Sequence, residues 1–332
     1  MTGTEPREPG KDKFSFRKLT VAAIMAATIV LGVYYIAAHM DEFRGLSFTD
    51  AWLLVPLILM SLAVSWALGL LIKFLLKPFG INLKFREWFG LSVITTLYNT
   101  ITPFRGGMIA RAVYLKQKHG FSYANFLAIM SGIYVINFFI QGAAGLASAW
   151  AISAQSKVFS PVIFAVFGLF FVSTLVMIVF SPKLPQSKNA LINKLVDIVN
   201  GWHLIRNNKK VVSMACFTAL LQLLFTAAAT SITYRMFGAD VGIVKSLFLS
   251  SVSLLGIVVS VTPGSLGIAE AISVFSALAI GITVAHSLPV VILTRLVSMS
   301  VIFTLGPVYT YILLKHSPAK TVADISKMAK ES

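Results

Sequence analysis

Glu270 and Arg295 are ionisable residues that lie deep inside apolar stretches of the sequence. An ionisable side chain in such surroundings is costly and is functional by default. Glu270 could balance a cation, accept a proton in a coupling cycle or contact a polar headgroup. It could equally cap the free N–H groups at the start of a helix. Arg295 needs a counter-charge or a hydrated cavity, and Glu270 is its obvious partner. A structural ion pair and a headgroup site therefore both stay open.

Two further arginines, Arg105 and Arg111, flank the start of a helix expected in the first half of the chain. An exposed helix N-terminus beside arginines suits a phosphate or carboxylate, because Arg offers a planar fork of donors. Arg111, Tyr114 and Lys118 recur at helical spacing and share one face. The alternative is ordinary positive charge at the inner membrane surface. The sequence favours that alternative for Lys118 and a ligand site for Arg105.

Arg105, Arg111 and Glu270 lie in or just after two copies of one short phrase. It reads Thr-Pro-Phe-Arg-Gly-Gly from Thr102 and Thr-Pro-Gly-Ser-Leu-Gly from Thr262, an offset of 160 (262 − 102). A second matched phrase starts at Gly120 and at Gly281, an offset of 161 (281 − 120). Pro and Gly inside apolar runs break helices, and paired broken helices point to the substrate site of a transporter. The candidate substrate-binding residues are Thr102, Pro103, Arg105, Gly107, Arg111, Thr262, Pro263, Gly264, Ser265, Gly267, Glu270 and Arg295.

The composition indicates a polytopic membrane protein. The chain is 57% apolar and 12% charged, whereas soluble domains carry about 25% charged residues. The formal net charge is +16, but the basic residues are scattered through short segments between apolar spans. That pattern suits the positive-inside rule and anionic lipids rather than nucleic acid. Cys216 is the single cysteine, so no disulfide framework exists within the chain.

Enzyme signatures are missing from the polar loops. They contain no Asp-x-Asp pair, His/Cys cluster, paired carboxylates or nucleophile elbow. We therefore expect neither catalysis nor a metal or cofactor.

Six apolar stretches are long enough to cross a membrane, which takes about 20 helical residues. They span about 19–38, 51–76, 123–151, 159–180, 211–237 and 288–314. The basic loops and both basic ends of the chain belong inside by the positive-inside rule. The sequence thus predicts an all-α, multi-pass protein of the plasma (inner) membrane with cytoplasmic termini.

The two broken segments are expected to be re-entrant helical hairpins. The stretch 89–101 is too short to span, and 243–280 is interrupted by the second phrase. With six full spans, one hairpin enters from each side, which makes inverted-topology repeats of about 51–181 and 210–315 within a single transmembrane domain, 1–332. Residues 182–209 are expected to form an amphipathic segment on the inner surface. Counting the segments after each Thr-Pro as crossings would give eight spans or more.

The two phrases resemble the motifs of the lysylphosphatidylglycerol synthase transmembrane-region family, also described as flippase-like integral membrane proteins. The first family motif reads Thr-Pro-Gly-Arg-x-Gly-Glu-x-x-Arg-Ala, and the second Pro-Gly-Gly-Leu-Gly-x-x-Glu-Ala, followed by Arg-Leu-Val in the last span. The matching residues are Thr102, Pro103, Arg105, Gly107, Arg111, Ala112, Pro263, Gly264, Leu266, Gly267, Glu270, Ala271, Arg295, Leu296 and Val297. Phe104 replaces the usual Gly, and Met108 the usual Glu. The resemblance covers about residues 50–315.

This resemblance implies that the chain moves phospholipids or lipid-linked headgroups between leaflets. The family's synthase domain is absent, so we expect no lipid synthesis. We expect a flippase or scramblase whose cationic cleft, formed by Arg105, Arg111 and Arg295 at the repeat interface, holds an anionic phospholipid or lipid-linked substrate. Two alternatives stay open: an ion-coupled carrier of small solutes, and a membrane-embedded transferase acting on a lipid carrier. Because Met108 replaces the Glu of the first motif, a mechanism that needs an acid in each half is not expected.

Overall fold

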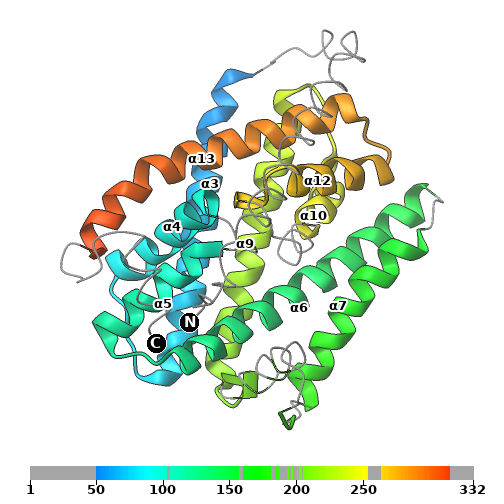
Figure 1. The fold of residues 1–332 in the computed structure, drawn as a ribbon. Coiled ribbons are helices and arrows are strands. Elements are labelled where there is room, and N and C mark those ends of the chain that lie inside the picture. Colours follow the sequence, from blue (N-terminus) through cyan, green and yellow to red (C-terminus); the bar gives the residue numbers. More distant parts are fainter. Residues whose placement is uncertain are drawn as a thin grey trace, which may run out of the picture.

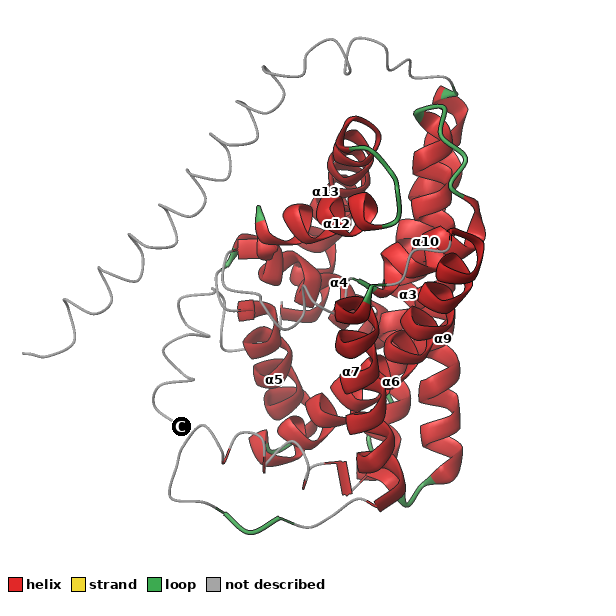
Figure 2. Ribbon diagram, turned by 90° about the vertical axis from the view of Figure 1, so that its right-hand side faces the viewer, coloured by secondary structure: helices red, strands yellow, loops and turns green. Residues whose placement is uncertain are grey.

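The described part of the chain is built from helices joined by short connections (Figures 1 and 2). The computed structural model describes residues 50–102, 105–156, 160–180, 184–186, 205–252 and 263–314, and a few residues between 193 and 203. The main helices in these ranges are α3 (Leu54–Leu76), α4 (Phe85–Ile101), α5 (Gly106–His119), α6 (Tyr123–Ser156), α7 (Pro161–Phe180), α9 (Lys209–Met236), α10 (Gly242–Ser251), α12 (Ile268–Ala279) and α13 (Val284–Leu314).

Five segments in the described ranges are long and apolar enough to cross a membrane. They are Ala51–Phe79, Tyr123–Gln155, Pro161–Phe180, Lys209–Met236 and Val284–Leu313. Each coincides with one of the six predicted spans, and the remaining one, 19–38, lies outside the described residues. The apolar side chains Val162, Leu169 and Val179 on α7 are each more than half exposed. Such a surface is expected where a helix faces lipid.

Two short-helix units interrupt the long helices, as expected from the broken phrases. Helices α4 and α5 pack on each other around the break at residues 102–105, and α12 follows the turn at 263–267. Both α5 and α12 are closed by a left-handed glycine, Gly120 (φ 64°) and Gly281 (φ 79°). Such a glycine stops a helix because it turns the chain where other residues are strained. The second matched phrase therefore encodes a helix end in each half.

The packing of the helices comes in exchangeable pairs. Helix α3 lies along α9, α4 lies against both α3 and α13, and α10 lies against both α9 and α6. Exchanging α3 with α9, α4 with α10 and α6 with α13 reproduces the same contacts among these six helices, while α7 packs on α6 outside this scheme. The exchanged helices also run in opposite directions (Figure 1): α3 descends where α9 rises, and α6 rises to the right where α13 descends to the left.

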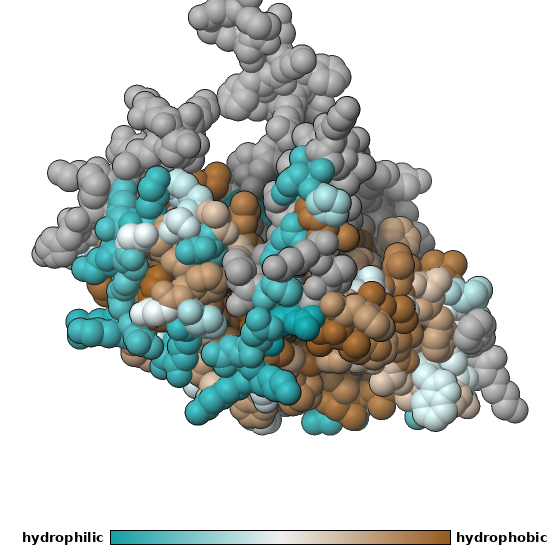
Figure 3. Space-filling model, turned by 90° about the horizontal axis from the view of Figure 1, so that it is seen from below, coloured by the Kyte–Doolittle hydropathy of each residue, from teal (hydrophilic) through white to brown (hydrophobic). Residues whose placement is uncertain are grey.

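The largest apolar core joins α3, α4, α5 and α6 and also includes Trp202 and Ile205. These two side chains are fully buried, so this end of the predicted amphipathic segment packs into the protein rather than into lipid. Three further apolar residues of the segment, Leu191, Leu195 and Ile198, lie outside the described residues. Seen from below, hydrophilic residues gather over one part of the molecule and border a hydrophobic area (Figure 3).

Candidate functional site

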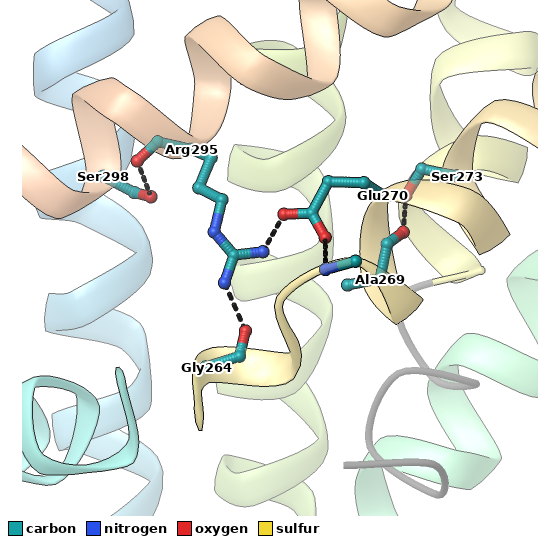
Figure 4. Close-up of polar contacts among 7 residues, drawn as sticks. Gly264, Ala269, Glu270, Ser273, Arg295 and Ser298 are labelled. Atoms are coloured by element: carbon teal, nitrogen blue, oxygen red, sulfur yellow. Dashed lines mark hydrogen bonds and ion pairs between the residues drawn. The ribbon is translucent and has the colours of Figure 1, made fainter. Parts of the chain in front are cut away.

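The carboxylate of Glu270 joins two structural elements (Figure 4). Its Oε2 accepts a hydrogen bond from the backbone N–H of Gly267 at 2.7 Å, which caps the start of α12. Its Oε1 accepts from Nη1 of Arg295 on α13. The helix cap and the ion pair expected from the sequence are thus both present, and they share one side chain.

Arg295 is the other half of this arrangement. Its Nη2 donates to the backbone carbonyl of Gly264, so one guanidinium holds both the broken turn and Glu270. The Arg295 and Glu270 side chains are only 19% and 16% exposed. The Nε of Arg295 is buried without a hydrogen-bond partner among the residues that the structure describes. One donor of a charged group therefore remains available.

A cavity of about 440 Å³ with both polar and apolar groups in its wall lies beside this ion pair. Five helices and the second broken turn contribute to its wall, and hydroxyl side chains dominate its polar surface. The hydroxyl residues are Thr100, Thr226, Thr230, Tyr234, Ser250, Ser273, Thr294 and Ser298. A pocket of this volume is in the range that accommodates small ligands or polar headgroups. Six of these hydroxyls already donate to protein acceptors, five of them to backbone carbonyls, so they offer a ligand mainly acceptor lone pairs.

The second broken turn meets the end of α4 at the edge of the cavity. A Cβ added to Gly264 would lie 3.3 Å from the Cα of Thr100, at the end of α4, and 2.9 Å from Nη2 of Arg295. Gly264 also has a left-handed backbone, with φ at 57°. Only glycine fits here without strain, because the turn is both left-handed and crowded. This explains the Pro-Gly pair of the second phrase.

The first broken turn is held differently. Arg105 takes a left-handed backbone (φ 58°), and its Nη1 donates to the Tyr134 hydroxyl at 3.3 Å. The N–H of Gly107 donates to Oδ1 of Asn99 at 3.0 Å, across the break. A Cβ at Gly107 would overlap the main chain of α4, so this glycine permits the close packing of α4 on α5. Thr102 donates its hydroxyl proton to the Tyr98 carbonyl.

Arg111 is the most deeply buried of the predicted site arginines. Its side chain lies on α5 with 4% of the residue exposed. In the described part of the chain, its Nε and Nη1 have no hydrogen-bond partner. A buried charge without partners is expensive, so such a group needs an anion or water to satisfy it.

The structure divides the predicted site residues into two groups. Gly264, Glu270 and Arg295 line the cavity, whereas Arg105 and Arg111 are not among its lining residues. Ser265 and Gly267 shape the second turn, with φ at 55° and 83°. Thr262 and Pro103 lie outside the described residues, and so does the side chain of Pro263. A single cleft that contains Arg105, Arg111 and Arg295 together is therefore not what the described residues form.

A second polar cluster lies where α4 begins and α5 ends. Oε1 of Glu87 accepts hydrogen bonds from the Tyr114 hydroxyl at 3.0 Å and from Nε2 of His119 at 3.1 Å. Its Oε2 accepts from the Lys84 N–H at 3.0 Å. Burial opposes ionisation of Glu87, but these contacts hold its pKa below the usual value. The only signal in the sequence was the position of Tyr114 on the face shared with Arg111 and Lys118.

These features define the class of protein: a polytopic α-helical membrane protein with a buried polar site at broken helices. No group of three or more His, Cys, Asp or Glu side chains converges as metal ligands would in the described ranges. A family model described as the lysylphosphatidylglycerol synthase TM region matches residues 18–306. Because the match covers most of the chain, the protein belongs to this family, as its two motifs predicted. A comparison with curated proteins finds no match.

Proposed function

We propose that the protein is a lipid transporter that moves a phospholipid or lipid-linked headgroup between the two leaflets. The observation that carries this proposal is the hydroxyl-lined cavity of about 440 Å³ beside Glu270 and Arg295, within a bundle of membrane-crossing helices. A polar cavity inside such a bundle shelters a headgroup from hydrocarbon, while the acyl chains stay in the bilayer. The family membership agrees with this class of function.

Arg295 supplies the recognition of an anionic headgroup in this proposal. The guanidinium is neutralised by Glu270 in the structure, yet its buried Nε has no partner among the described residues. A phosphate would accept from Arg295 in competition with the Glu270 carboxylate. Protonation of Glu270 would remove that competition, so proton binding and headgroup binding would favour each other. This gives Glu270 its role in coupling.

Inverted repeats provide the movement in this proposal. Three observations support two related halves of opposite orientation: the exchangeable helix contacts, the opposed helix directions in Figure 1, and the left-handed backbones at Arg105 and Ser265. Transporters built in this way expose a central site to alternate sides when one repeat moves against the other. The two short-helix units would then be the re-entrant hairpins.

The orientation proposed for the protein follows from its charges. One end of the bundle carries exposed basic residues where α3 ends, where α5 ends and where α9 begins: Lys77, Lys118, Lys209 and Lys210. The opposite end carries Trp52, Trp150 and Asp240. By the positive-inside rule the basic end faces the cytoplasm. We therefore place the protein in the plasma (inner) membrane with both termini inside, and we expect no catalytic activity.

The test is a vesicle assay that follows labelled anionic phospholipids between leaflets, with and without a pH gradient. We expect translocation in the native protein and its loss in Glu270→Gln. Asp240→Asn is the matched control, because it makes the same change at an exposed acid (68% exposed side chain) away from the cavity. A requirement for the gradient would support proton coupling.

Two results would overturn this function. Unchanged lipid movement in folded Glu270→Gln and Arg105→Ala would show that neither broken turn takes part in transport. No movement of any lipid by folded native protein would favour a carrier of soluble solutes. Product formation from a donor and a lipid acceptor would instead identify a transferase.

A further inference from the structure

A hollow larger than the cavity at Glu270 and Arg295 lies away from the ion pair. It has a volume of about 760 Å³ and lies between the start of α4, the end of α5 and the end of α13. Lys84, Arg86 and Lys118 contribute positive charge to its wall, and Phe85 and Ile312 contribute apolar surface. We call this hollow the basal cleft. It shares no lining residue with the cavity at Glu270 and Arg295.

The polar part of the basal cleft is a fixed structure. The single carboxylate in its wall, Glu87, accepts from Tyr114, His119 and the Lys84 N–H at 3.0–3.1 Å. Tyr114 is itself buried, with 4% exposed. The cleft presents three exposed cations against one carboxylate, whose oxygens already accept from these donors. Its net character is therefore cationic.

The apolar part of the basal cleft indicates its depth in the membrane. Phe85 is 55% exposed and lies edge-on to Trp88, with ring centroids 5.0 Å apart. Lys73 approaches the Trp88 ring at 5.8 Å. Aromatic rings beside lysines are typical of the level of the lipid headgroups. Ile312 is 42% exposed on the other side of the cleft. An amphiphile is thus matched at both its charged and its apolar end.

We propose that the basal cleft binds an anionic phospholipid from the leaflet that it faces. The phosphate lies against Lys84, Arg86 and Lys118, and the first part of the acyl chains lies along Phe85 and Ile312. Gln117 and Asn82 supply further polar groups in the same wall. The lipid bridges α4, α5 and α13, so it tethers the base of the first short-helix unit to the last helix. This binding does not depend on transport through the cavity.

The experiment measures binding of dioctanoyl phosphatidylglycerol to the purified full chain in nonionic detergent. Lys84→Gln/Lys118→Gln removes two cleft charges. Lys209→Gln/Lys210→Gln removes two exposed charges from the same end of the molecule and is the matched control. Lys84 and Lys118 line the cleft, so removing their attraction for the anionic lipid is expected to raise the Kd roughly tenfold or more. Lys209 and Lys210 do not line the cleft, so their removal is expected to leave the Kd within about twofold. Dioctanoyl phosphatidylcholine and inorganic phosphate are the comparison ligands.

Three results would overturn the proposal. Equal losses in both double variants would show general surface attraction instead of a cleft. An unchanged Kd in Lys84→Gln/Lys118→Gln would remove the lipid from the cleft. Competition by inorganic phosphate at the concentrations at which the lipid binds would make the cleft a free-phosphate site. Repeating the series in the Glu270→Gln background separates the cleft from the transport cavity, because the cleft-dependent loss is expected to persist there.

Discussion

Arg105 and Ser265 are the two non-glycine residues with a positive φ in the described part of the chain, at 58° and 55°. They are 160 positions apart (265 − 105), which is the offset of the repeated Thr-Pro phrase. A left-handed backbone is strained for residues with a Cβ and persists only where the surroundings impose it. The two halves therefore share a backbone conformation at a point where their side chains have nothing in common.

Ser265→Gly should relieve this strain in the second turn. Ser265→Ala is the matched variant, because both changes remove the hydroxyl but only glycine accepts the left-handed backbone freely. We expect the glycine variant to be more stable than the alanine variant by about 1 kcal/mol. Thermal unfolding in detergent measures the difference. Equal stabilities would mean that the turn relaxes in solution.

Gly264→Ala tests the close approach of the second turn to the end of α4. Gly281→Ala is its control, because Gly281 also has a positive φ but a Cβ there meets nothing within 4 Å. Both variants carry the conformational cost of about 1 kcal/mol. Only Gly264→Ala also presses on Arg295 and Thr100, so it should lower the melting temperature further and impair transport. A melting temperature no lower than that of Gly281→Ala would count against the contact.

The Glu270–Arg295 pair should show strong coupling in a double-mutant cycle. Glu270→Gln keeps an acceptor for the Gly267 N–H, so it isolates the loss of charge. Removing either partner leaves a mostly buried charge alone, which costs about 3 kcal/mol or more, while Glu270→Gln/Arg295→Met should cost less than the sum. The Arg235–Asp240 pair is 3.8 Å apart and more than 60% exposed, and its cycle should show coupling of at most about 1 kcal/mol.

Arg111→Met should separate stability from function. It replaces a buried guanidinium whose Nε and Nη1 lack partners among the described residues with an apolar side chain of similar length. Replacing a buried charge in this way is neutral or stabilising by about 1 kcal/mol or more. We expect a higher melting temperature together with slower lipid transport. A variant that transports normally would make Arg111 a structural residue.

The stability that the hydrogen bonds from Tyr114 and His119 to Glu87 contribute should depend on pH. The pKa of Glu87 is lowered from 4.5 in the folded protein, so its contribution to stability is complete above about pH 4.5 and is lost as the pH falls through the lower folded value. The difference in melting temperature between the native protein and Glu87→Gln should therefore shrink as the pH drops below 4.5. A difference that stays constant from pH 7 to about 3 would show that the carboxylate adds nothing to this stability.

The long spans and the Glu270–Arg295 ion pair were predictable from the length of the apolar runs and from isolated charges within them. A helix must be apolar over about 20 residues to cross the bilayer, and five of the six such stretches are confirmed as helices. Glu270 and Arg295 stand out as charges in apolar surroundings, and each was expected to be the other's partner. Asn99, a polar residue near the end of α4, accepts a hydrogen bond from the N–H of Gly107 on α5.

The separation of Arg105 and Arg111 from the cavity was not predictable. Residue types show that an arginine suits an anion, but not which helix its side chain faces. Glu87 was overlooked for a similar reason. A carboxylate among lysines at a membrane surface reads as ordinary loop charge, and its partner His119 lies 32 residues later (119 − 87). The cluster forms because α4 and α5 pack on each other, which brings the start of α4 beside the end of α5.

The attachment of the second turn decides which parts of the molecule can move as one piece. Gly264, Glu270 and Arg295 all belong to the second half, and their mutual bonds tie its turn to α12 and α13. Thr100 of the first half lies close to Gly264, since a Cβ added there would be 3.3 Å from the Thr100 Cα. If the second turn moved away from the end of α4, no ion pair would break, because Glu270 and Arg295 would both move with the second half. The Glu270–Arg295 ion pair would therefore keep the second half rigid while the two halves move, and it would not oppose their movement.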